Sequence, residues 1–145
     1  MTVIFGVPKG DRCGYKLWEE KQAPQVIFEI SSRSAWGDDL HKKWRLYERL
    51  GVSEYNIFDP EYDYLPEPLL AYRLTDGELE QITIENDLIF SPALNLEIVD
   101  TGDGLRFFDS SANEYVRTAD ETETALNAAE ARIVSLEAEL AKSKS

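Results

Sequence analysis

The sequence predicts an α+β domain with a mixed central sheet, followed by a β-meander and a C-terminal helix. An apolar strand at 26–30 precedes an amphipathic helix at 38–50 and a further strand at 55–59, which forms a β-α-β unit. After about residue 69 the apolar residues alternate with period two, as in a meander, and the C-terminal segment at 118–145 contains a heptad pattern from Leu126 to Leu140.

Length and composition favour one folded domain at 1–117 with an attached helix at 118–145. The 145 residues are 43% hydrophobic, which is enough to bury a core. The sequence contains neither a run of about eighteen apolar residues nor a basic leader, so we expect a cytoplasmic protein without a membrane partner. With one cysteine, Cys13, and one histidine, His41, a Cys/His zinc cluster is excluded.

The N-terminal elements follow from apolar runs and breakers. Residues 2–5 form a strand-like run, and the glycines and proline within 6–11 predict a loop. The segment 15–21 mixes aromatic and charged residues and fits a short strand or a helical turn. Ala23-Pro24 then leads into the strand at 26–30.

The helix at 38–50 has apolar residues at helical spacing and ends at Gly51, as helices commonly do. A strand, a helix and a second strand in this order require a crossover, so the strands at 26–30 and 55–59 should pair in parallel.

The later strands are expected as hairpins. Residues 69–74 and 79–84 flank an Asp-Gly turn, 94–99 and 105–108 flank a glycine-rich turn, and 114–116 adds a short last strand. Thr118 and Glu121 form a capping box that starts a helix to about Ala141.

The C-terminal helix carries a possible pairing surface. Its apolar residues recur at spacings of three and four, which is the seam of a short coiled coil: Leu126, Ala129, Ile133, Leu136 and Leu140. The same segment fits a surface helix docked on its own domain or a frayed end, so a homodimer and a monomer both remain open.

Charge is distributed unevenly along the chain. The net charge is −13, which argues against strong nucleic-acid binding. Residues 1–49 nevertheless carry nine basic and seven acidic side chains, whereas the remainder carries six and twenty-one. The first third is therefore the part that tolerates a polyanion such as DNA.

Glu29 is a carboxylate inside an apolar strand and needs a partner, because Glu is seldom buried unpaired. It can form a structural ion pair with Lys43, or it can hold a divalent metal together with the Ile30 backbone carbonyl. In the second case Lys43 would orient the attacking water or offset charge on a phosphate. Asp39 and Lys43 also form an ordinary i, i+4 helix pair.

Several segments resemble a known family in sequence and order. They are 8–12 (PKGDR), 15–20 (YKLWEE), 23–32 (APQVIFEISS), 42–48 (KKWRLYE), 51–60 (GVSEYNIFDP) and 91–94 (SPAL), followed by an alanine- and glutamate-rich helix. Together they resemble the Uma-two family of restriction endonucleases, a branch of the PD-(D/E)XK nuclease superfamily. The resemblance covers nearly the whole chain.

The resemblance implies a restriction-endonuclease-like fold and hydrolysis of DNA phosphodiester bonds with Mg²⁺ or Mn²⁺. In the family pattern the lysine sits on the helix four residues before a tyrosine, which falls on Lys43 and Tyr47, while Glu29 falls on a metal ligand. Asp39 also matches as a supporting residue.

The family's other metal-binding Asp would fall at or just before Met1, and this sequence has no such residue there. We therefore expect an N-terminally truncated form of the fold, with Asp38 and Asp39 as the nearest substitutes. The sequence leaves open an active endonuclease, an inactive one, a poorly folding remnant, and a catalytically silent protein that associates through its C-terminal helix.

Overall fold

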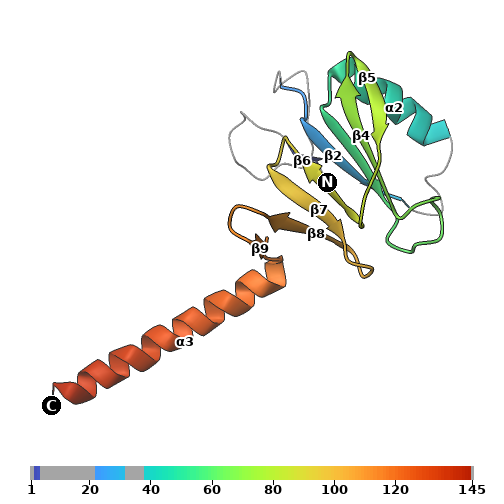
Figure 1. Cartoon of the computed structure of the whole chain (residues 1–145). Coiled ribbons are helices and arrows are strands. Elements are labelled where there is room, and N and C mark those ends of the chain that lie inside the picture. The colour runs from blue at the N-terminus through green and yellow to red at the C-terminus, as the bar shows by residue number, and fades with distance from the viewer. Residues whose placement is uncertain (1, 4–21, 32–37, 145) are drawn as a thin grey trace. The chain divides into compact units, whose positions relative to one another are not determined.

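The computed structural model describes residues 2–3, 22–31 and 38–144, with side chains for 22–31 and 41–144 (Figure 1). The chain divides into two compact units, Met1–Glu114 and Tyr115–Ser145. The predicted loop at 6–11, the segment 15–21 and Cys13 lie outside the described residues. Of the predicted opening strand, the described part is β1 (Thr2–Val3).

The predicted β-α-β unit is confirmed. Strand β2 (Val26–Ile30), helix α2 (Asp38–Leu50) and strand β3 (Glu54–Phe58) follow one another, and β2 pairs in parallel with β3 from Val26↔Glu54 to Ile30↔Phe58. The observed β3 begins and ends one residue earlier than predicted.

Helix α2 ends at Gly51, as predicted. Gly51 adopts φ +72°, a left-handed conformation that costs glycine little. The Gly51 amide donates to the Glu48 carbonyl and the Val52 amide donates to the Tyr47 carbonyl, both at 3.1 Å. This pair of bonds is a Schellman motif, and it satisfies carbonyls that the end of the helix would otherwise leave unbonded.

The first sheet is mixed and has the order β1-β2-β3-β4-β5. Strands β4 (Leu69–Thr75) and β5 (Glu78–Ile82) form the predicted hairpin. Its turn residues Asp76 and Gly77 have φ of 51° and 87°, as a two-residue type I′ turn requires.

A second, antiparallel sheet follows, with strands β6 (Leu88–Ser91), β7 (Leu96–Asp100), β8 (Leu105–Asp109) and β9 (Glu114–Tyr115). Strands β7 to β9 correspond to predicted strands, whereas β6 was not predicted. The chain reaches β6 through a turn at Asn86 and Asp87, whose φ values are 54° and 59°. Asn and Asp tolerate this left-handed conformation better than other non-glycine residues do.

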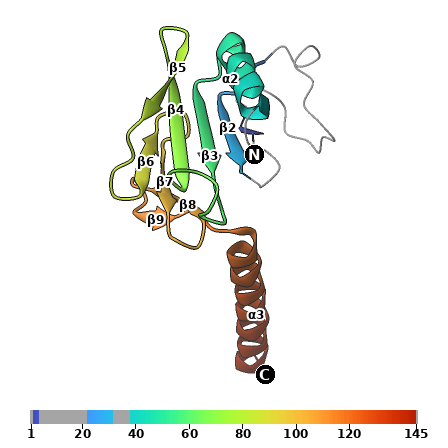
Figure 2. The same ribbon diagram turned by 90° about the vertical axis from the view of Figure 1, so that its right-hand side faces the viewer.

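The first sheet is covered on both faces, and α2 and the second sheet lie on opposite sides of it (Figure 2). Side chains alternate along β2, so Ile27 packs toward α2 whereas Val26 and Phe28 pack toward the second sheet. Phe28 meets Phe107 of β8 edge to face, with ring centroids 5.5 Å apart. The α+β class and the mixed central sheet are therefore as predicted.

Helix α3 (Ala119–Ser143) forms the second unit and runs two residues beyond the predicted end. Its predicted capping box is present: the Thr118 hydroxyl accepts from the Glu121 amide, and the Glu121 carboxylate accepts from the Thr118 amide. Within the described part of the chain, no helix has the length and apolar character needed to cross a membrane.

Candidate functional site

Glu29 lies near the carboxyl end of β2 and faces α2. Ile27, two residues earlier, belongs to the cluster packed against α2, and alternation along the strand places Glu29 on the same face. The carboxylate extends beyond the apolar part of that face, and its side chain is 25% exposed. Glu29 therefore lies in a strand of the sheet, as predicted.

Two side chains of α2 hold the Glu29 carboxylate, one at each oxygen. Lys43 Nζ donates to Oε2 at 3.3 Å, and the Tyr47 hydroxyl donates to Oε1 at 2.8 Å. Lys43 and Tyr47 are four residues apart and therefore lie on the same side of the helix. The structure thus joins the predicted pair of Glu29 and Lys43 and adds Tyr47 as a hydrogen-bond donor.

The contact between Lys43 and Glu29 is loose. A charge-assisted N–H···O bond is usually about 2.7–2.9 Å long, shorter than the 3.3 Å found here. The Lys43 side chain is also 35% exposed, so water competes for both charges. A pair of this kind stabilises a fold by about 0–1 kcal/mol.

The Ile30 carbonyl points toward the β1 side of β2. The Ser31 amide donates to the Phe58 carbonyl at 2.7 Å, so the backbone groups of Ser31 point toward β3. Backbone groups of successive residues alternate between the two edges of a strand, and those of Ile30 therefore point away from β3. The Asp39 backbone lies in α2, whereas its side chain lies outside the described residues.

The chemistry of these donors suits a hard divalent cation only in part. Glu29 and the Ile30 carbonyl offer oxygen, which Mg²⁺ and Mn²⁺ prefer, and a carboxylate has about four lone-pair sites, of which these two contacts use two. Among the described residues, however, no group of three or more His, Cys, Asp or Glu side chains is placed to hold a metal ion. Among the described residues, this cluster therefore offers one carboxylate, that of Glu29.

Aromatic contacts fix α2 on the sheet and so fix the positions of Lys43 and Tyr47. The Tyr47 ring meets Tyr55 with centroids 5.0 Å apart, and Trp44 meets Tyr72 at 4.4 Å. Glu48 accepts hydrogen bonds from Trp44 Nε1 and from the backbone amide at the start of β5, both at 2.9 Å. One helix face is thereby held by β3, β4 and β5.

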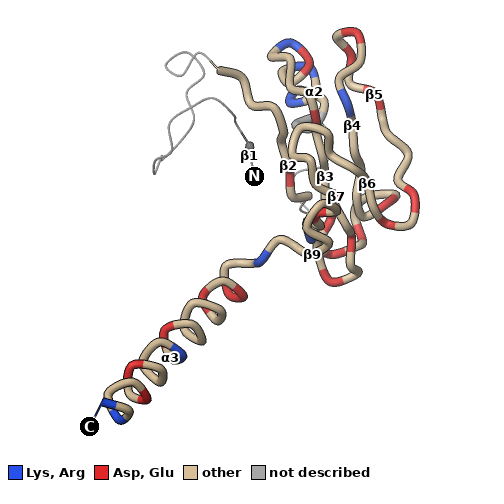
Figure 3. Tube along the Cα trace, turned by 60° about the vertical axis from the view of Figure 1, so that its left-hand side comes forward, with Lys and Arg blue, Asp and Glu red and all other residues tan. Residues whose placement is uncertain are grey.

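A line of basic side chains runs along the exposed side of α2. Lys42, Arg45 and Arg49 are exposed and occur at spacings of three and four, so they share one stripe of the helix. Figure 3 shows this concentration of basic residues on α2, in contrast to the acidic residues on the loops of the two sheets. We call Lys42, Arg45 and Arg49 the basic stripe.

Two other carboxylates of β3 and the loop after it serve the fold. Asp59 is fully buried and accepts four backbone N–H bonds of 2.5–3.1 Å from the following loop. Burial raises the pKa of Asp59, but the hydrogen bonds outweigh it and hold the pKa below its ordinary value of 3.8. Buried Glu54 accepts from the Ser91 hydroxyl at 2.5 Å and from the Ala93 amide at 2.8 Å, which ties β3 to the second sheet.

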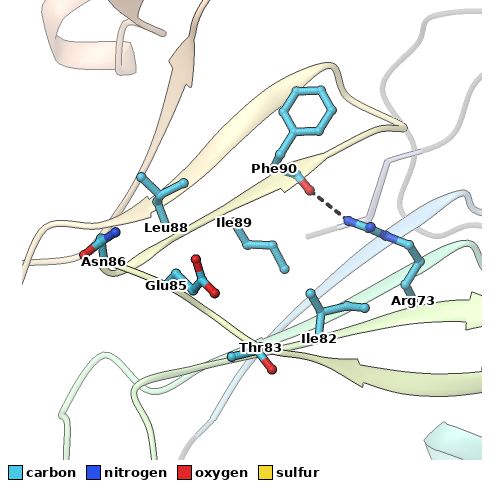
Figure 4. Close-up of a pocket in the computed structure, with 8 residues that line it drawn as sticks. All are labelled: Arg73, Ile82, Thr83, Glu85, Asn86, Leu88, Ile89 and Phe90. Atoms are coloured by element: carbon cyan, nitrogen blue, oxygen red, sulfur yellow. Dashed lines mark hydrogen bonds between the residues drawn. The ribbon is translucent and has the colours of Figure 1, made fainter.

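A pocket of about 360 Å³ lies between the end of β5 and β6, away from Glu29 (Figure 4). Arg73 reaches across it and donates from Nη2 to the Phe90 carbonyl at 2.9 Å. The remaining lining consists of three apolar side chains, two uncharged polar ones and one carboxylate: Ile82, Leu88, Ile89, Thr83, Asn86 and Glu85. Arg73 therefore joins the two sheets, and we assign this pocket no chemistry.

Sequence reasoning matched Tyr47 to the family pattern but missed its bond to Glu29, and it did not single out the basic stripe. The spacing of four between Lys43 and Tyr47, on the helix that follows Glu29, was the signal for the bond between Tyr47 and Glu29. The spacings of three and four between Lys42, Arg45 and Arg49 were the signal for the basic stripe.

The comparisons agree with the resemblance seen in the sequence. A search of curated proteins finds no match to the chain. The model of the Uma2 family, described as "Putative restriction endonuclease", matches residues 2–102, which include β2, α2 and β3. The chain therefore belongs to the Uma2 family.

Proposed function

We propose that this protein is an endonuclease that hydrolyses DNA phosphodiester bonds with Mg²⁺ or Mn²⁺ at the Glu29–Lys43–Tyr47 cluster. The observation that carries the proposal is the carboxylate of Glu29, held at both oxygens by one helix, in a chain of this family. We further propose that residues 1–117 form the catalytic domain.

In this proposal each residue of the cluster has one task. Glu29 and the Ile30 carbonyl would hold the metal ion, with Asp39 in support one turn before Lys43 on α2. When bound, the ion would neutralise charge on the phosphate and acidify a bound water. Tyr47 keeps one carboxylate oxygen fixed, and the Lys43 ammonium beside the other oxygen would orient the attacking water or offset charge on the phosphate.

The basic stripe supports DNA as the substrate. The stripe lies on the same helix as Lys43, on the side of α2 that faces away from the sheet, where a polyanion could contact all three of its side chains. Each phosphate contact releases condensed counterions, and the logarithm of the binding constant falls with the logarithm of salt concentration by about 0.9 per contact. Replacing Arg45 and Arg49 with Gln should therefore reduce that slope by about 2.

Cleavage of supercoiled plasmid tests the proposal. The chain should nick plasmid in Mg²⁺ or Mn²⁺ and lose this activity when EDTA is added, and Lys43→Ala should reduce it strongly. A matched control is Lys142→Ala, which removes an exposed lysine of α3 that belongs neither to the cluster nor to the basic stripe. Activity that survives Lys43→Ala unchanged would remove Lys43 from the mechanism.

A second candidate function is a catalytically silent protein that associates through α3. The observation in its favour is the exposure of the large seam residues within that helix: Leu126, Ile133, Leu136 and Leu140 are 40–58% exposed. This candidate predicts a homodimer and no metal-dependent cleavage. Self-association is also compatible with the endonuclease, so the mass of the particle and the cleavage of plasmid must be measured separately.

A further inference from the structure

The seam of α3 has the residue types of a two-stranded coiled coil. Leu126, Ile133 and Leu140 occupy heptad positions a, and Ala129 and Leu136 occupy positions d. A β-branched residue at a, here Ile133, with leucine at the next d favours two strands over three or four. No residue of α3 is buried.

Charges beside the seam are complementary between two parallel copies. In a parallel pair, position g of one helix faces position e five residues later in its partner. Arg132 at g would face the partner's Glu137 at e, and Glu139 at g would face the partner's Lys144 at e. Both contacts join opposite charges, and symmetry repeats each of them.

The remaining flanking positions do not oppose this arrangement. Glu123 and Glu130 at e would face Thr118 and Ala125 at g, which are uncharged. An antiparallel pair would instead bring position e of one helix against position e of the other, and three of those positions are glutamates. The flanking charges therefore favour the parallel orientation.

Contacts within one helix do not explain these charges. No acidic residue stands three or four positions from Arg132, and no basic residue stands three or four positions from Glu137. Neither side chain can thus form the usual i, i+3 or i, i+4 ion pair within its own helix. A second copy of α3 offers both of them a partner.

We propose that α3 pairs with α3 of a second copy of this chain as a parallel, in-register coiled coil, with Arg132 of each copy facing the partner's Glu137. This inference rests on the proposed self-association and adds the orientation and register of the two helices. A parallel pair attaches both N-terminal units at the same end of the coil.

Sedimentation equilibrium of the full chain, over a wide range of concentrations, tests the pairing. Arg132→Glu and Glu137→Arg each turn two attractions into two repulsions, so each should raise the dimer dissociation constant roughly 5- to 30-fold. The double variant restores the opposite charges in reversed order and should return to within about threefold of the unmodified chain. The matched control is Lys142→Glu, which makes the same charge change at position c, outside the seam.

The outcomes separate the inference from the self-association on which it rests. A chain that is monomeric at every concentration overturns both. If the chain dimerises but the effects of the two charge reversals on the free energy of dimerisation add in the double variant, the parallel register is overturned. Self-association then remains intact. Circular dichroism of each variant shows whether α3 remains helical, so that loss of the helix is not taken for loss of the ion pair.

Discussion

Tyr47→Phe tests whether the Tyr47 hydroxyl holds Glu29 in place. The substitution removes one oxygen and keeps the ring, so the contact with Tyr55 at 5.0 Å is retained. Any loss of stability that depends on Glu29 therefore comes from the 2.8 Å hydrogen bond between the hydroxyl and the carboxylate.

The size of the effect follows from the geometry. Hydrogen bonds to charged groups contribute about 1.5–3 kcal/mol when well shielded from water. Glu29 is 25% exposed, so water replaces part of the lost bond and we expect about 1 kcal/mol. Removing the Lys43 ammonium should cost less, about 0–1 kcal/mol, because that contact is longer and more exposed.

A double-mutant cycle with Glu29→Ala isolates the bond from the other contacts of Tyr47. The free energy of unfolding is measured by urea titration for the unmodified chain, each single variant and the double variant. We expect a coupling energy of about 1 kcal/mol. If the effects of the two single variants add within about 0.3 kcal/mol, the hydroxyl does not hold Glu29 and the proposed cluster loses one member.

Three further predictions concern the fold. Phe28→Ala opens a cavity between the two sheets, where Phe28 is buried against Phe107, and should lower the free energy of unfolding by about 3–5 kcal/mol in urea titration. Gly77→Ala places an alanine in a left-handed turn at φ +87°, where the added Cβ has no neighbour within 4 Å. The free energy of unfolding in urea titration should therefore fall by the backbone strain alone, about 1–2 kcal/mol. Because the pKa of Asp59 lies below 3.8 in the folded chain, the unfolded chain binds its proton more readily. The stability that Asp59 provides is therefore present above about pH 4 and is lost as the pH falls through the lower pKa of the folded chain. In urea titrations from pH 3 to 7, the free energy of unfolding of Asp59→Asn should depend less steeply on pH than that of the unmodified chain.

The elements that were predictable are those with strong local signals. Helix α2 shows helical periodicity and ends at a glycine, and the β4–β5 hairpin has the Asp-Gly step that its turn requires. A carboxylate in an apolar strand, together with a lysine on the following helix, also predicts the contact between Glu29 and Lys43 that the structure contains.

The features that were missed depend on contacts distant in sequence or on less familiar turns. Strand β6 is short and follows an Asn-Asp turn, whose left-handed residues carry a weaker signal than glycine. Glu54 finds its hydrogen-bond partners 37 and 39 residues later, and no local pattern reveals such a pairing. Asp59 was matched to the family pattern without a role, although a buried Asp before an irregular loop is well suited to accept the loop's amides.

The most direct measurement is the rate of plasmid nicking in Mg²⁺ for Glu29→Gln, compared with the unmodified chain. Glu80→Gln is the matched control, because it makes the same change at an exposed position of β5. If Glu29 is a ligand of the metal, Glu29→Gln should abolish Mg²⁺-dependent cleavage while Glu80→Gln leaves the rate unchanged. Cleavage by Glu29→Gln at the rate of the unmodified chain would contradict the assignment of this site.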